Sequence, residues 1–126
     1  MDKKNPYVRR YLAQRAELIG AIRLPNDTFT KNAGTKVTSD ILFLQKRDHM
    51  TLEEPNWIYL DYDDNGIEQN RYYVQHPEMI LGEMVMESGP YGMRSTCRPY
   101  EGRELSELLS VAVEALNGTI DEVEME

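Results

Sequence analysis

The segment Leu18–Arg47 constrains the fold of this chain more than any other part of the sequence. It holds two apolar runs, IGAIRL and DILFLQ, which a polar loop containing Phe29 joins. Short apolar runs bounded by turn residues such as Pro25 predict buried strands. A basic stretch with helical spacing precedes them, and Asn5-Pro6 suits a helix start. The expected order is a helix to about Glu17, a strand at Leu18–Leu24, a loop at Asn26–Thr35 and a buried strand at Val37–Gln45.

The second half of the chain has the pattern of a strand-rich extension closed by a helix. Asp63-Asp64-Asn65-Gly66 is a strong turn signal. A stripe of apolar residues at helical spacing begins at Leu105, and Asn117-Gly118 is a favourable stop. The other expected elements are strands at Trp57–Asp61 and Arg71–Gln75, a helical turn at His76–Glu78 and a hairpin of Glu83–Glu87 with Arg94–Arg98. We expect segments 1–48 and 49–126 to pack as one domain, since 126 residues suit a single core.

The chain is acidic overall but basic at its front. Its formal net charge is −8, from 22 Asp and Glu against 14 Lys and Arg. Tight DNA binding by this chain alone is therefore not expected, because phosphate neutralisation dominates such affinity. Most basic residues lie in the first half, which is compatible with one DNA-facing surface or with ordinary solvated charge. The single Cys97 and the lack of a long apolar run predict a cytoplasmic protein without membrane contact.

Two short motifs suggest chemistry but have simpler explanations. Asn5-Pro6-Tyr7 resembles the Asn/Asp-Pro-Pro-Tyr/Phe motif of amino-methyltransferases, but one proline is missing and no strand precedes it, so a helix start is favoured. Asp61–Gly66 matches the first half of a calcium loop, yet Tyr72 stands where a bidentate glutamate is needed. A hairpin turn is favoured there, and a calcium-responsive domain is the alternative. No His or Cys stands at zinc-ligand spacing, so the residues predict no metal site and no catalytic group.

Phe29 is the most informative single side chain in the loop between the two apolar runs. An aromatic ring in such a loop either covers the end of the core or provides a stacking platform. Enzymes that modify a flipped base need such a platform, because the base loses its stacking when it leaves the duplex. From the residues alone, core coverage is the favoured interpretation.

The stretch VRRYLAQRAELIGAIRLPNDTFTKNAGTKVTSDILFLQKR resembles a known enzyme family. It is similar to the region that follows the catalytic motif in N6-adenine DNA methyltransferases of type I modification subunits. The resemblance is closer still to the methylase region of large helicase–methylase proteins of bacterial conjugative elements and phages. Similar segments there match MDKKNP, AQRAELIGAIRLP, NAGTKVTSDILFLQKRD, HPEMILGEM and STCRPYEG, which together cover nearly the whole chain.

The resemblance implies an α/β fold that forms the late part of a Rossmann-like methyltransferase sheet. Leu18–Leu24 would run parallel to its neighbours, and Ile41–Gln45 would be an antiparallel insertion beside it. The family uses S-adenosylmethionine as methyl donor and adenine in DNA as substrate. The loop would face the target base, which makes base-contacting candidates of Phe29, Asn32 and Thr38. The candidates for contacts to the DNA backbone are Arg9, Arg10, Lys31 and Lys36.

The sequence departs from the family in what it lacks. The glycine-rich cofactor turn, the acidic ribose-binding residue and the catalytic motif lie upstream in the family and are not among these residues. We therefore expect no S-adenosylmethionine binding and no methylation by this chain alone, since half a sheet has no cofactor crevice. An exposed edge on Leu18–Leu24 would favour pairing with an upstream methyltransferase half or a second copy. The alternative is a non-catalytic protein- or DNA-interaction module that keeps the fold as a scaffold.

Overall fold

The computed structural model describes residues 1–28, 38–89 and 92–124, with the backbone alone for 117–124. Its longest strand pair joins the two apolar runs of the sequence. Helix α1 (Tyr7–Arg15) leads directly into strand β1 (Ala16–Leu24), which pairs antiparallel with β2 (Ser39–Lys46). The Asn5 side chain accepts a hydrogen bond of 3.0 Å from the backbone N–H of Tyr7, which confirms the expected helix start.

Two further antiparallel pairs and a long helix complete the chain. With the short helical elements between them, the remaining elements in chain order are η1 (Asn56–Ile58), β3 (Leu60–Tyr62), β4 (Glu68–Asn70), α2 (Arg71–Gln75), η2 (Pro77–Met79), β5 (Gly82–Gly89), β6 (Gly92–Pro99) and α3 (Leu105–Glu124). Strand β3 pairs with β4, and β5 pairs with β6. The expected turn between β3 and β4, the helical turn at Pro77 and the second hairpin are confirmed.

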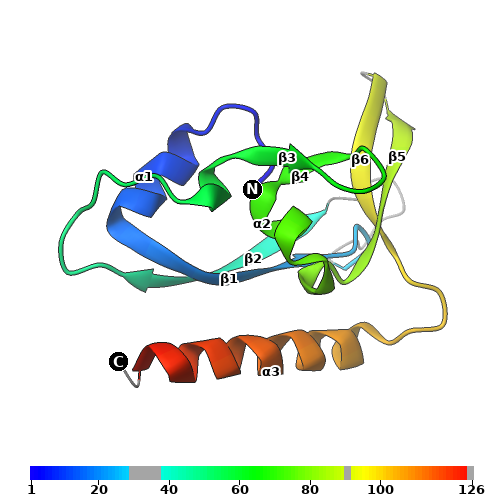
Figure 1. Ribbon diagram of the computed structural model, residues 1–126. Helices are drawn as coiled ribbons and strands as arrows, with labels where there is room; N and C mark the ends of the chain where they lie inside the picture. The colour runs from blue at the N-terminus through cyan, green and yellow to red at the C-terminus, as the bar shows by residue number, and fades with distance from the viewer. Residues whose placement is uncertain (29–37, 90–91, 125–126) are drawn as a thin grey trace.

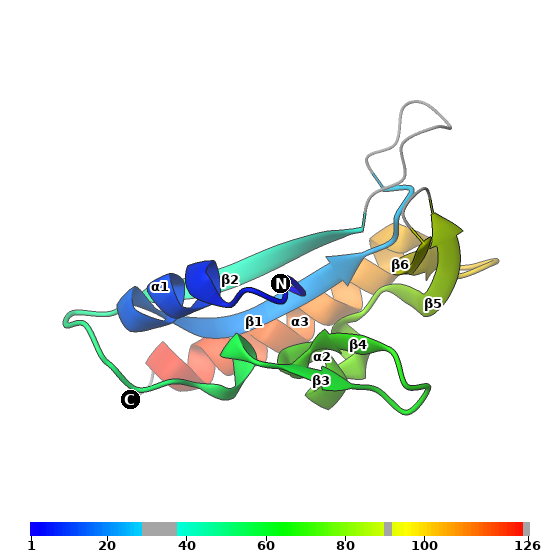
Figure 2. The same ribbon diagram turned by 90° about the horizontal axis from the view of Figure 1, so that it is seen from above.

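The elements lie in layers around β1. Figure 1 shows α3 along one side of the β1–β2 pair, with α1 and the β3–β4 hairpin on the other side. Figure 2, turned by 90°, shows α3 running beneath β1 and the β5–β6 hairpin at the end of β1 that leads to the loop. Helix α3 approaches β1 closely at Gly20, where an added Cβ would clash with Cδ2 of Leu116.

The main core draws on both halves of the sequence. Its buried side chains come from β1, α2, η2, the η2–β5 link, β6 and α3: Ala21, Ile22, Leu24, Tyr73, Met79, Ile80, Leu81, Cys97, Ala112 and Leu116. A smaller cluster of Ala13, Trp57 and Ile58 joins α1 to η1. Burial raises the pKa of the Cys97 thiol to about 12, so this cysteine is a packing residue rather than a reactive one.

Three expected elements differ from the structure. Arg71–Gln75 is helix α2 rather than a strand, because the Asn70 side chain caps it by accepting from the Tyr72 N–H at 2.9 Å. The strand expected to begin at Trp57 begins at Leu60, after the turn of η1. The last helix continues through Asn117-Gly118 to Glu124, since its leucine stripe packs along the sheet and sustains it.

The expectation that β2 is buried on both faces is also wrong. Ile41 is 37% exposed and Leu44 is 40% exposed, and among the described strands β2 pairs with β1 alone. The edge of β1 that was expected to be open is partly covered. The Leu81 N–H donates to the Arg23 carbonyl at 2.9 Å, next to the isolated parallel bridge between Arg23 and Ile80. The open edge of this sheet therefore belongs to β2.

The structure confirms the mixed helix-and-strand class. The sheets of the described residues are three antiparallel pairs, and the one parallel contact of β1 is the bridge from Arg23 to Ile80. No helix in the described ranges is both long enough and apolar enough to cross a membrane.

Candidate functional site

Arg23 on β1 is the centre of the largest polar network in the described residues. Its guanidinium is forked between two carboxylates, with Nε and Nη2 at 2.8 and 3.0 Å from Asp40, and Nη1 and Nη2 at 2.7 and 2.8 Å from Asp2. Its Cζ lies 4.3 Å from the ring centre of Tyr73, which forms the floor beneath it. The side chain is 3% exposed, so the network is internal.

The network also reaches the chain start and the β3–β4 turn. The Met1 ammonium lies 3.3 Å from Asp40. On the other side, Gln69 accepts from Arg23 at 3.3 Å and donates to Asp63 at 2.9 Å. Asp63 further accepts from the N–H groups of Asn65 and Ile67, both at 2.9 Å. Asp63, which matched a calcium-loop position, thus serves the turn and the network.

The charges of the network hold one another ionised. Burial alone would raise the pKa of Asp40, but the hydrogen bonds and charge of Arg23 outweigh it and hold that pKa below its usual value. Burial alone would lower the pKa of Arg23, but its bonds to Asp40 and Asp2 raise it. Burial and the Asp40 charge raise the pKa of Tyr73, which stays neutral. The network is therefore a fixed structural hub rather than a proton-transfer site.

The two ends of the loop between β1 and β2 are fixed on β6. The Asn26 N–H donates to the Cys97 carbonyl at 2.7 Å, and the Asn26 amide donates to Thr96 at 2.9 Å. From the other end, Thr38 Oγ1 accepts from the Cys97 N–H at 2.9 Å and lies 3.3 Å from Thr96 Oγ1. The hairpin β5–β6 thus holds both stems of the loop together.

The predicted site residues fall into three groups. Phe29, Lys31, Asn32 and Lys36 lie outside the described residues. Thr38, a base-contacting candidate, is half-buried at the loop stem and bonded to β6. Arg9 and Arg10 lie on α1, away from that stem (Figure 2).

Arg9 is not available to a phosphate. It is 6% exposed, and its guanidinium donates to the carbonyls of Ile58, Met1 and Lys3 at 2.7, 3.0 and 2.6 Å. These bonds tie α1 to η1 and to the chain start, so the prediction of a backbone contact for Arg9 is wrong. Arg10 is exposed and forms an ion pair with Glu54 at 2.8 Å.

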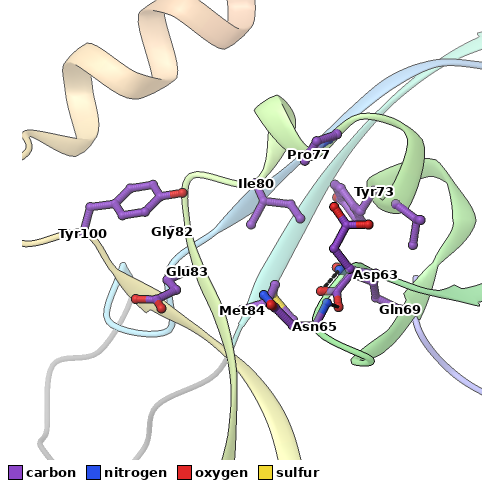
Figure 3. A pocket seen from close by; sticks show the side chains of 12 residues that line it. Asp63, Asn65, Gln69, Tyr73, Pro77, Ile80, Gly82, Glu83, Met84 and Tyr100 are labelled. Atoms are coloured by element: carbon purple, nitrogen blue, oxygen red, sulfur yellow. Dashed lines mark hydrogen bonds between the residues drawn. The ribbon is translucent and has the colours of Figure 1, made fainter.

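A cavity of about 270 Å³ lies beside the hub, between the β3–β4 turn, α2 and the start of β5. Figure 3 shows Tyr100 and Glu83 on one side of it and Asp63 and Gln69 on the other. Its lining includes three acidic residues and no Lys or Arg. This wall repels phosphate, so we place no DNA contact here.

Sequence reasoning missed the hub. The signal was an arginine inside the apolar run IGAIRL, which needs a buried counter-charge. In the antiparallel register Arg23 stands directly opposite Asp40, so the strand pairing could have supplied one partner. Asp2 and Gln69 come from distant segments, which no local pattern indicates.

Comparisons of the chain with protein-family models, with curated proteins and with solved structures gave no match. The assignment of function therefore depends on the residues and contacts described above and on the resemblance in the sequence.

Proposed function

We propose that this chain is the DNA-contacting C-terminal portion of an N6-adenine DNA methyltransferase-like protein and does not methylate DNA by itself. In this proposal an upstream portion supplies the S-adenosylmethionine site and the catalytic motif. The order of α1, β1, a loop and an antiparallel β2 supports it, because the resembling region runs as helix, strand, loop and strand.

The observation that carries the proposal is the anchored stem of the loop. Asn26 and Thr38 are both held by the Thr96–Cys97 segment of β6, so the loop between them starts and ends on the same strand. Loops held on rigid scaffolds are where binding residues concentrate. The proposal gives Phe29 the stacking role and Lys31 and Lys36 the phosphate contacts.

We expect weak, salt-sensitive binding of a labelled duplex that carries one unpaired adenine. Lys36→Ala should reduce the slope of log affinity against log salt by about 0.9, because one phosphate contact is lost. Phe29→Ala should weaken binding by about 1–3 kcal/mol at constant salt, through the loss of base stacking. Fluorescence anisotropy over a salt series measures both effects.

Lys46→Ala is the matched control for Lys36→Ala. It removes the same charge from the other end of β2, where the side chain is exposed. It should leave the salt slope unchanged. An equal loss for both lysines would mean that the net charge, not the loop, governs binding, and the proposal would fail.

A second candidate function, a non-catalytic interaction module, is favoured by the open edge of β2. A strand with one edge unpaired in the described residues, and with Ile41 and Leu44 exposed, is a template for pairing with another sheet. This candidate predicts self-association at micromolar concentration in analytical ultracentrifugation. Leu44→Lys should shift the chain towards monomer, whereas Val111→Lys on the exposed face of α3 should not. A wild-type chain that sediments as a monomer throughout would exclude self-association by this edge.

A further inference from the structure

A second cavity, of about 530 Å³, lies on the other side of α2 from the acidic one. It is enclosed by β1, η1, the α2–η2 segment and α3. The proposed DNA-contacting loop contributes nothing to its walls in the described residues, and neither does the Arg23 hub. Its volume lies in the range of pockets that enclose small organic molecules.

Three rings line this cavity: Trp57, Tyr72 and His76. The His76 ring rests on Tyr72, with 4.6 Å between ring centres and 33° between planes, and its side chain is 47% exposed. One face of Tyr72 is therefore covered, and Trp57 is 6% exposed, so the outer side of His76 is the most exposed ring surface of the lining. Leu18, Ile19 and Leu116 add apolar walls.

The charge in the lining has one sign. Among the lining residues that the structure describes, Glu78 is the only carboxylate, and no Lys or Arg contributes. The Glu78 Oε1 lies 3.3 Å from Nδ1 of His76, and the Glu78 side chain is more than half exposed. The chain as a whole carries a net charge of −8. An anionic ligand is disfavoured in such a pocket, and a cation with an apolar body is favoured, since ring faces and a carboxylate both attract positive charge.

We propose that this cavity binds an alkylated ammonium group carried on an apolar body. The methyl or methylene groups pack against Leu18 and Leu116, and the charge faces the rings and Glu78. The site is separate from the proposed DNA-contacting loop, so its test does not depend on that function. The group could belong to a free molecule of the choline type or to a methylated lysine side chain.

The test compares choline with 3,3-dimethyl-1-butanol, a neutral molecule of nearly the same shape. Trp57 is the only tryptophan of the chain and lines the cavity, so its fluorescence reports on occupancy. Backbone amide shifts in ¹H–¹⁵N spectra give a second readout that does not require a change in emission. We expect saturable shifts centred on the cavity residues, with choline binding roughly tenfold more tightly than the alcohol.

Glu78→Gln should weaken choline binding by up to about fivefold and leave the alcohol unaffected. The control Glu107→Gln removes the same charge from an exposed position on α3 and should change neither. The experiment is repeated with a trimethyllysine peptide. Saturable binding of choline or of the peptide supports the proposal, and the ligand with the higher affinity shows whether a free molecule or a methylated lysine side chain is preferred. Equal binding of choline and the alcohol, or no binding of any ammonium ligand, would overturn it.

Discussion

Replacement of Arg23 by methionine is expected to lower the free energy of unfolding by about 3–5 kcal/mol. The substitution keeps an apolar stem of similar length but removes the charge that two partly buried carboxylates share. Asp40 would retain only the Met1 ammonium as a charged partner, and Asp2 would retain the N–H of Asn70. Urea unfolding followed by Trp57 fluorescence and circular dichroism measures the loss.

Arg98→Met is the matched control for this prediction. Arg98 also pairs with a carboxylate, Glu83, at 3.1 Å, but both side chains are more than half exposed. Its loss should cost less than about 1 kcal/mol. The double variant Arg23→Met/Asp40→Asn should recover part of the stability, because it removes one unpaired buried charge. A loss below about 1 kcal/mol for Arg23→Met would show that the hub does not stabilise the fold.

The pH dependence gives the hub a second signature. Burial alone would raise the pKa of Asp40, but Arg23 holds it below the ordinary value of 3.8. Such a carboxyl stabilises the folded state above its ordinary pKa, and this contribution is lost as the pH falls through the folded-state pKa. Without Arg23, the effect of burial on Asp40 is opposed less strongly, so we expect the pKa of Asp40 to rise in the variant. Protonation of Asp40 at low pH then makes the folded variant more stable than it is at pH 7. The stability difference between wild type and Arg23→Met should therefore shrink from about pH 7 to about pH 4.

The elements that the sequence predicted correctly are those with a local cause. The start of α1 depends on Asn5, which bonds to a backbone group two residues away. The β3–β4 turn depends on Asp63, whose partners are within six residues. Strand β1 follows from an apolar run, interrupted by Arg23, that ends before Pro25. Patterns of this kind are visible in a window of ten residues.

The features that the sequence did not predict depend on tertiary contacts. The YYV run of Arg71–Gln75 has strand-like composition, yet Asn70 caps a helix there and Tyr73 is fully buried in the core. The centre of β2, ILFL, is apolar, but Ile41 within it is 37% exposed. Arg9 has the sequence context of a surface cation, and only the fold places three carbonyls around it. In the candidate site, the sequence predicted the loop between β1 and β2, but it did not predict the hydrogen bonds that hold the ends of this loop on β6.

Gly82→Ala is expected to destabilise the chain by about 2–3 kcal/mol. Gly82 is buried at the start of β5, and a Cβ there would lie 2.5 Å from the backbone oxygen of Arg98 and 2.7 Å from Sγ of Cys97. A backbone oxygen cannot turn aside as a flexible side chain can, so the first rung of the β5–β6 pair must open. That rung lies next to the Cys97 carbonyl, which holds the loop stem at Asn26.

Gly89→Ala tests the same substitution at the other end of β5. Its nearest contacts would be 3.3 Å, to the Arg94 side chain and to the Gly92 oxygen, and the lost flexibility of the unfolded chain offsets the crowding. We expect a change within about 0.5 kcal/mol there. Hydrogen exchange should show faster exchange of the Asn26 and Cys97 amides in Gly82→Ala alone, because their bonds join β6 to the loop stem. Unchanged protection of these amides would mean that the start of β5 and the loop stem are independent.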